Sequence, residues 1–138
     1  MRSVNPATGE TIREYSEQTE GEVEALIEAA DTAYRSWSRT PLETRSDALR
    51  RIASVLEERV EEYASLITAE MGKRIAESRG EVRKCAWLAR YVADQGPVAL
   101  SPETVETEAA ESYVRFDPLG VILAVMPWNF PFWQLFRA

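Results

Sequence analysis

The sequence contains no histidine and only one cysteine, Cys85, among its 138 residues. Without histidine the chain lacks the commonest metal ligand and the base of Ser-His-Asp and Cys-His catalysis, so no metal site is predicted. A single cysteine cannot close an internal disulfide, and the first residues lack the apolar stretch of a secretion signal. We therefore expect a cytoplasmic protein.

Long apolar runs and clustered basic residues are also missing. No run approaches the roughly 20 apolar residues that a membrane helix needs, so no membrane partner is expected. A net charge of −7 argues against a nucleic-acid surface, which requires clustered Lys and Arg. The chain has neither a G-x-G-x-x-G fingerprint nor a complete phosphate-binding P-loop. Its 45% hydrophobic and 28% charged residues are typical of a globular protein.

The basic residues are almost all arginines, with Lys73 and Lys84 as the only lysines, while glutamate is abundant. We interpret the excess of acid as a solvated face. The acidic pairs Glu57-Glu58 and Glu61-Glu62 fall opposite an apolar helix face, so they too are assigned to solvent rather than to acid/base chemistry.

A first helix is predicted after a capping box formed by Thr19 and Glu22, and it should end near Arg39. Apolar residues at helical spacing give it one face that we assign to the core. This face comprises Val23, Leu26, Ile27, Ala30, Tyr34 and Trp37.

A second helical stretch is predicted from Thr40, as cap, through Pro41 in the first helical position to Gly72, a C-terminal glycine. The pattern allows a break between Glu57 and Glu62. Its buried stripe comprises Leu42, Leu49, Ile52, Ala53, Leu56 and Val60.

A third helix is predicted from about Ile75 to Asp94, with Gly96-Pro97 ending it and with Ala86, Ala89 and Val92 turned inward. Cys85 lies in an apolar stretch of this helix. Burial raises the pKa of a thiol and makes it inert, so Cys85 is predicted to be a packing residue.

Two short strands are predicted outside the helices. Thr11 to Tyr15 follows the turn over residues 5–9, and Ser112 to Asp117 alternates in polarity before a proline. Between the last helix and the second strand, Ser101 to Glu111 is acidic and without periodicity, which indicates a loop or an arm.

The apolar run Val121–Met126, bounded by Gly120 and Pro127, predicts a strand covered on both faces, as in a parallel sheet. Loops at the carboxyl ends of such strands bind ligands. Here the loop holds Asn129 between aromatic residues and prolines, where a rigid amide N–H can stabilise an oxyanion. The alternative is that Asn129 caps a turn, the commonest role of asparagine in loops.

Three motifs, in order along the chain, resemble the NAD(P)-dependent aldehyde dehydrogenase superfamily. They are Asn5-Pro6-Ala7-Thr8-Gly9-Glu10, Glu70-Met71-Gly72-Lys73, and Pro118-Leu119-Gly120-Val121-Ile122 followed by Met126-Pro127-Trp128-Asn129-Phe130-Pro131. The resemblance covers essentially the whole chain but only about the first third of a family member. It implies an incomplete α/β fold.

The resemblance also implies a division of the chain. Residues 1–100 would be the N-terminal helical part of the cofactor-binding domain, and residues 101–117 a segment of the β-arm that joins subunits. Residues 118–138 would begin the modified Rossmann sheet and carry the active-site loop. A complete enzyme of this kind is expected to be a homo-oligomer, a dimer or tetramer.

Residue roles carry over from the resemblance. Positions matching Val125, Met126, Pro127 and Trp128 line the ribose and adenine side of the NAD or NADP pocket, partly through backbone carbonyls. Asn129 matches the oxyanion-hole amide. The family's nucleophilic cysteine lies far downstream of this motif, and Cys85 precedes it, so the isolated chain is expected to be inactive.

The substrate expectation rests on the residues after the motif. Phe130, Trp133, Gln134 and Arg137 share one helix face and match positions that line the family's substrate tunnel. Succinate-semialdehyde dehydrogenases often carry arginine at the position of Arg137, where it can pair with the distal carboxylate. The alternative is a surface arginine.

Two other classes of function stay open at this point. One is a non-catalytic remnant or subunit that pairs with an intact homologue. The other is a stand-alone helical binding module.

Overall fold

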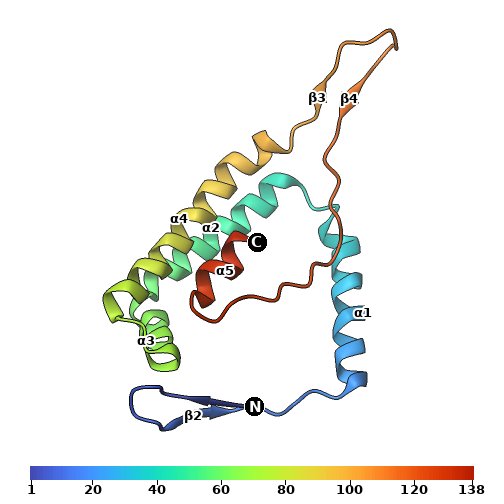
Figure 1. Ribbon diagram of the computed structural model, residues 1–138. Coiled ribbons are helices and arrows are strands. Elements are labelled where there is room, and N and C mark those ends of the chain that lie inside the picture. Colours follow the sequence, from blue (N-terminus) through green and yellow to red (C-terminus); the bar gives the residue numbers. More distant parts are fainter.

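The computed structural model describes residues 1–138 and contains five helices and four short strands (Figure 1). The helices are α1 (Glu20–Trp37), α2 (Leu42–Glu58), α3 (Val60–Met71), α4 (Ile75–Ala99) and α5 (Pro131–Arg137). The strands β1 (Arg2–Val4) and β2 (Thr11–Glu14) form one antiparallel pair, and β3 (Glu103–Thr104) and β4 (Tyr113–Val114) form another. None of the helices combines the length and apolar character of a membrane span.

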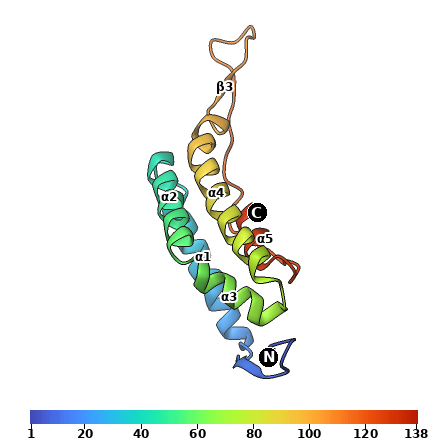
Figure 2. The ribbon, with the colours of Figure 1, turned by 90° about the vertical axis from the view of Figure 1, so that its left-hand side faces the viewer.

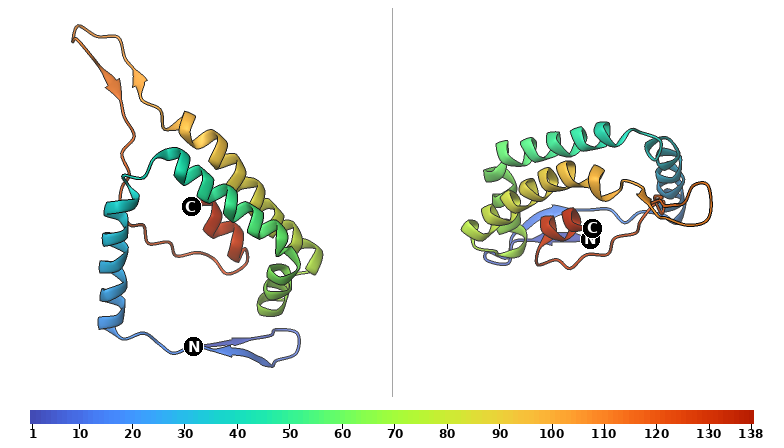
Figure 3. Two further views of the ribbon diagram at one scale, coloured as in Figure 1. Left: turned by 180° about the vertical axis from the view of Figure 1, so that it is seen from behind. Right: turned by 90° about the horizontal axis from the view of Figure 1, so that it is seen from above.

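The core lies around α4. Helix α2 runs along it, and α3 and α5 also pack against it (Figures 1 and 3). The face of α4 that meets its neighbours is built largely from small side chains, which let helix backbones approach closely. The buried cluster comprises Ala53, Leu56, Val60, Ile67, Val82, Cys85, Ala86 and Ala89.

Local signals for helix ends are confirmed at three places. Thr19 and Glu22 form the predicted capping box, and the break between α2 and α3 falls at Arg59. Gly72 ends α3 in the left-handed conformation with φ 71°, which favours glycine. A Cβ there would also lie 3.1 Å from Cγ of Pro6, so the N-terminal turn packs directly against this helix end.

Two predicted helix boundaries are wrong. Helix α2 begins at Leu42 with Pro41 as its cap, and the Thr40 hydroxyl donates instead to the Ser36 carbonyl at 3.5 Å. Helix α4 continues through Pro97 to Ala99. A proline removes only one helical N–H, and Gly96 before it has no Cβ to clash with the ring, so the helix persists.

The apolar face of α1 is not buried, contrary to prediction. No residue of α1 is buried, and the helix stands apart from the α2 and α4 pair (Figures 1 and 3). One hydrogen bond, from the Tyr34 hydroxyl to the Pro118 carbonyl at 3.1 Å, ties it to the later chain. Ile52 and Val92, predicted inward, are also exposed, at 43% and 42%, and each lines an open pocket instead of the core.

The predicted buried strand over Val121–Met126 is not formed. This stretch has no regular secondary structure, and the Leu123 side chain is 89% exposed. A strand needs a neighbour to satisfy its backbone N–H and C=O groups, and no other strand of this structure lies beside it.

Residues 101–117 form an exposed hairpin that extends beyond the helices (Figure 2). Its strand β4 covers only two residues of the predicted Ser112 to Asp117 strand, and it pairs with β3, which was not predicted. The Thr11 to Tyr15 strand is confirmed as β2, within one residue.

Cys85 is fully buried in α4, as predicted, and its burial raises the pKa of the thiol to about 12. At pH 8 the folded chain should therefore react with iodoacetamide at least about 100-fold more slowly than the chain in concentrated guanidinium chloride. Because folding raises this pKa, stability should also fall as the pH rises from about 9 toward 12. Equal alkylation rates in the folded and unfolded chains would show an accessible thiolate instead.

Candidate functional site

The Pro127–Pro131 motif leads from the extended segment into α5. Pro131 occupies the first turn of the helix, where its missing N–H costs nothing. Phe132, the next residue, packs its ring against Tyr63 of α3, with the ring centres 5.4 Å apart. The motif is therefore held at the point where α5 joins the core.

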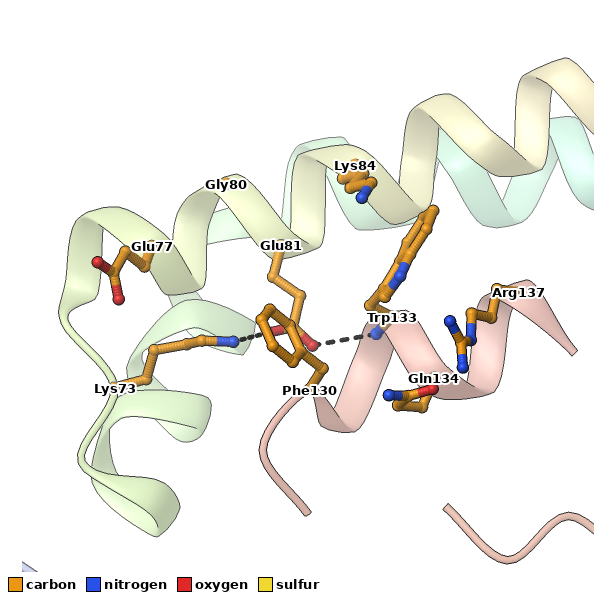
Figure 4. A pocket seen from close by; sticks show the side chains of 9 residues that line it. All are labelled: Lys73, Glu77, Gly80, Glu81, Lys84, Phe130, Trp133, Gln134 and Arg137. Atoms are coloured by element: carbon orange, nitrogen blue, oxygen red, sulfur yellow. Dashed lines mark hydrogen bonds and ion pairs between the residues drawn. The ribbon is translucent and has the colours of Figure 1, made fainter. Parts of the chain in front are cut away.

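A pocket of about 400 Å³ lies between α4 and α5 (Figure 4). From α5 and its cap it is lined by all four residues predicted to contact substrate, Phe130, Trp133, Gln134 and Arg137. From α4 and the residues just before it come Lys73, Glu77, Gly80, Glu81 and Lys84. The helical spacing thus brings the four predicted residues to one cavity, while their roles stay predictions.

The pocket carries uncompensated positive charge. Neither Lys84 nor Arg137 forms an ion pair in the structure, and the Lys84 Nζ lies 3.7 Å from the centre of the Trp133 ring. Glu77 is paired with Arg74, 3.6 Å away. Such a site favours an anionic group.

Lys73 and Glu81 form a buried ion pair at the inner end of the pocket, and the sequence did not indicate it. The second oxygen of Glu81 accepts hydrogen bonds from the backbone N–H groups of Phe132 and Trp133, each at 3.0 Å, and Figure 4 draws the bond to Trp133. One signal was present: Glu81 falls at helical spacing between Ser78 and Cys85, on the buried face of α4.

Asn129 is exposed, and its side chain forms no hydrogen bond within the chain. Its backbone carbonyl accepts a hydrogen bond from the Lys73 Nζ at 3.2 Å. A turn-capping asparagine accepts from a backbone N–H through its side-chain oxygen, and Asn129 has no such bond. The amide is thus free to donate to a bound molecule.

The four predicted cofactor residues, Val125, Met126, Pro127 and Trp128, lie on the surface of the extended segment. Only Trp128 lines a described pocket, of about 350 Å³, together with Leu66, Ile67, Glu70, Met71 and Pro131. The structure therefore places these residues next to Asn129 but does not gather them around one cavity.

The chain is similar to known aldehyde dehydrogenases in sequence and in structure. A probable succinate-semialdehyde dehydrogenase (NADP(+)) from Synechocystis is 45% identical over 137 residues, which are 99% of this chain and 30% of the relative. A crystal structure of succinic semialdehyde dehydrogenase from Streptococcus pyogenes, with NADP+, matches with a TM-score of 0.93 and 34% identity over 99% of this chain and 30% of that one. A mutant betaine aldehyde dehydrogenase from Staphylococcus aureus, solved with NAD+, matches with a TM-score of 0.90 and 31% identity. That match covers 99% of this chain and 28% of the other.

The chain spans about 30% of the length of these relatives. The structural match over 99% of the chain confirms the predicted fold class, an incomplete α/β fold of the N-terminal portion. The sequence model of the aldehyde dehydrogenase family matches residues 1–138, and the chain therefore belongs to that family.

Proposed function

We propose that this chain forms the N-terminal third, roughly, of an NAD(P)+-dependent aldehyde dehydrogenase that oxidises succinate semialdehyde to the corresponding acid. One observation supports this choice of substrate. The pocket beside Asn129 presents two cations that form no ion pair, Lys84 and Arg137. The substrate has an aldehyde at one end and a carboxylate at the other, so a cationic pocket suits its distal end. The relatives named for this substrate support the assignment.

Arg137 is the residue proposed to hold the carboxylate. A guanidinium binds a carboxylate through two parallel hydrogen bonds and fixes its orientation. Lys84 adds a second positive charge from the opposite wall, where its ammonium group lies over the Trp133 ring. Phe130 and Trp133 offer the apolar surface that the methylene groups of the substrate require.

Asn129 is the proposed oxyanion donor. When a nucleophile of the complete enzyme attacks the aldehyde carbon, negative charge develops on the carbonyl oxygen, and an amide N–H held nearby stabilises it. The Asn129 side chain has no competing hydrogen bond, which leaves its donors available. This chain supplies no candidate nucleophile, since Cys85 is buried and protonated.

Val125, Met126, Pro127 and Trp128 are the residues proposed to hold the dinucleotide. They fit such a role because their exposed apolar side chains and unpaired backbone carbonyls suit a ribose and an adenine face. Bound NAD or NADP would accept the hydride that leaves the substrate.

The hairpin over residues 101–117 is proposed to contact another subunit in a homo-oligomer, because it extends away from the helices and buries nothing within this chain. We expect the complete protein in the cytoplasm, where a thiol such as Cys85 stays reduced.

A second candidate is a non-catalytic chain that pairs with an intact relative. The exposed apolar face of α1 favours it, since such faces are usually covered by protein. Co-purification with a full-length relative would support this candidate, and a monodisperse solitary chain would support a stand-alone module.

The 138 residues alone should not oxidise aldehydes. With succinate semialdehyde and either dinucleotide, absorbance at the reduced-nicotinamide band should not rise above a control without protein. Turnover that Cys85→Ser abolishes would make Cys85 a nucleophile and contradict its burial.

Asn129→Ala should lower kcat by roughly 100- to 1,000-fold in a complete enzyme that contains this chain, because the donor acts chiefly in the transition state. Asn5→Ala is the matched control, since Asn5 is the only other asparagine and bonds only within the N-terminal turn. It should change kcat less than about twofold. A similarly small effect of Asn129→Ala would remove the oxyanion role.

Arg137→Leu should lower kcat/KM for succinate semialdehyde by roughly 10- to 150-fold in the same enzyme, which corresponds to losing one charged hydrogen-bonding partner. Butanal, which has no carboxylate, should be oxidised nearly as before. Arg35→Leu is the control, because Arg35 is exposed, lies outside the pocket and the hairpin, and pairs only with Asp31. Equal losses on both aldehydes would assign Arg137 a general structural role.

A further inference from the structure

Of the ten ion pairs in the structure, only that of Lys73 with Glu81 is buried, with side chains 8% and 2% exposed. In every other pair both side chains are at least 37% exposed. Taking two charges out of water costs free energy that their attraction regains only where further hydrogen bonds satisfy them. The additional partners of this pair therefore show what it holds in place.

Those partners all belong to the segment around Asn129. Glu81 accepts from the N–H groups of Phe132 and Trp133, while Lys73 donates to the Asn129 carbonyl. The Lys73 Nζ also lies 3.7 Å from the centre of the Phe130 ring, in a cation–π contact. Lys73 and Glu81 thus hold the backbone of residues 129–133, and Figure 4 shows their ion pair and the bond from Glu81 to Trp133.

Apart from the packing of Phe132 and α5 against the core, the segment has few other restraints. Residues 119–127 have no regular structure, and α5 is only seven residues long. Its first-turn N–H groups have no partner within the helix, and Glu81 satisfies two of them. Since the Asn129 side chain forms no hydrogen bond, its direction is inherited from a backbone that Lys73 and Glu81 hold.

We propose that the buried Lys73–Glu81 pair is a positioning device that sets the direction of the Asn129 amide. Neither residue is catalytic; each acts through the loop. This inference rests on the oxyanion role proposed above for Asn129. A pair that served only the stability of the α4 and α5 packing would affect the amount of folded enzyme but not the direction of one amide.

The first test is a double-mutant cycle in a complete enzyme that contains this chain. Glu81→Gln keeps the shape of the side chain, removes its charge, and should lower kcat about 10- to 100-fold, because small misplacements of a catalytic group have effects of this size. The KM for the aldehyde should change less than about twofold. In the Asn129→Ala background, the same substitution should change kcat by less than about twofold.

Glu61→Gln is the matched control, because Glu61 also joins two helices through an ion pair, with Arg79 at 2.7 Å, but on the surface. It should leave kcat unchanged. If Glu81→Gln does not fold, the double variant Lys73→Met with Glu81→Gln replaces it, since neutral substitutes of similar volume for a buried pair are well tolerated. If Glu81→Gln, or its replacement, lowered kcat by the same factor in the wild-type and the Asn129→Ala backgrounds, the proposal would be overturned.

A second readout separates this inference from the oxyanion role itself. In isotope-labelled protein, the side-chain amide signals of Asn129 should shift in Glu81→Gln and stay in place in Glu61→Gln. If Asn129→Ala leaves kcat unchanged, the oxyanion role fails while the shifted amide signals still support positioning. Unmoved Asn129 signals in Glu81→Gln would overturn positioning whatever the kinetics.

Discussion

The packing of α4 is the constraint on which the rest of this chain depends. Helices α2, α3 and α5 each lie against it, so one helix face must serve three neighbours. Where α2 approaches, that face carries small residues such as Ala86 and Ala89. Where α5 approaches, it carries the carboxylate of Glu81. The position of the Asn129 loop is thus a property of α4 as much as of the motif itself.

Features that depend on a few adjacent residues could be predicted from the sequence. The capping box of Thr19, the left-handed Gly72 and the buried Cys85 each follow from a window of a turn or two. The gathering of Phe130 and Arg137 at one pocket follows from helical spacing alone. These are the cases in which local geometry decides the outcome.

Features that depend on distant partners could not be predicted. An apolar pattern shows that α1 and the run over residues 121–126 suit a covered environment, but not whether a covering element exists. Its helical spacing could indicate that Glu81 is buried, but not what it binds, because its acceptor role is defined by backbone groups 51 and 52 residues later. Both lysines, Lys73 and Lys84, lie over the aromatic rings of Phe130 and Trp133, and these contacts too join residues far apart in the sequence.

The extended segment from Leu119 to Val125 has a consequence for handling the chain. It combines exposed β-branched and leucine side chains with unpaired backbone groups and contains no charge. Such a stretch is a template for intermolecular strand pairing and cross-β stacking. The isolated chain is therefore prone to aggregate through residues 119–125, which lead into the Asn129 loop. A charged residue introduced in this stretch would improve its solubility.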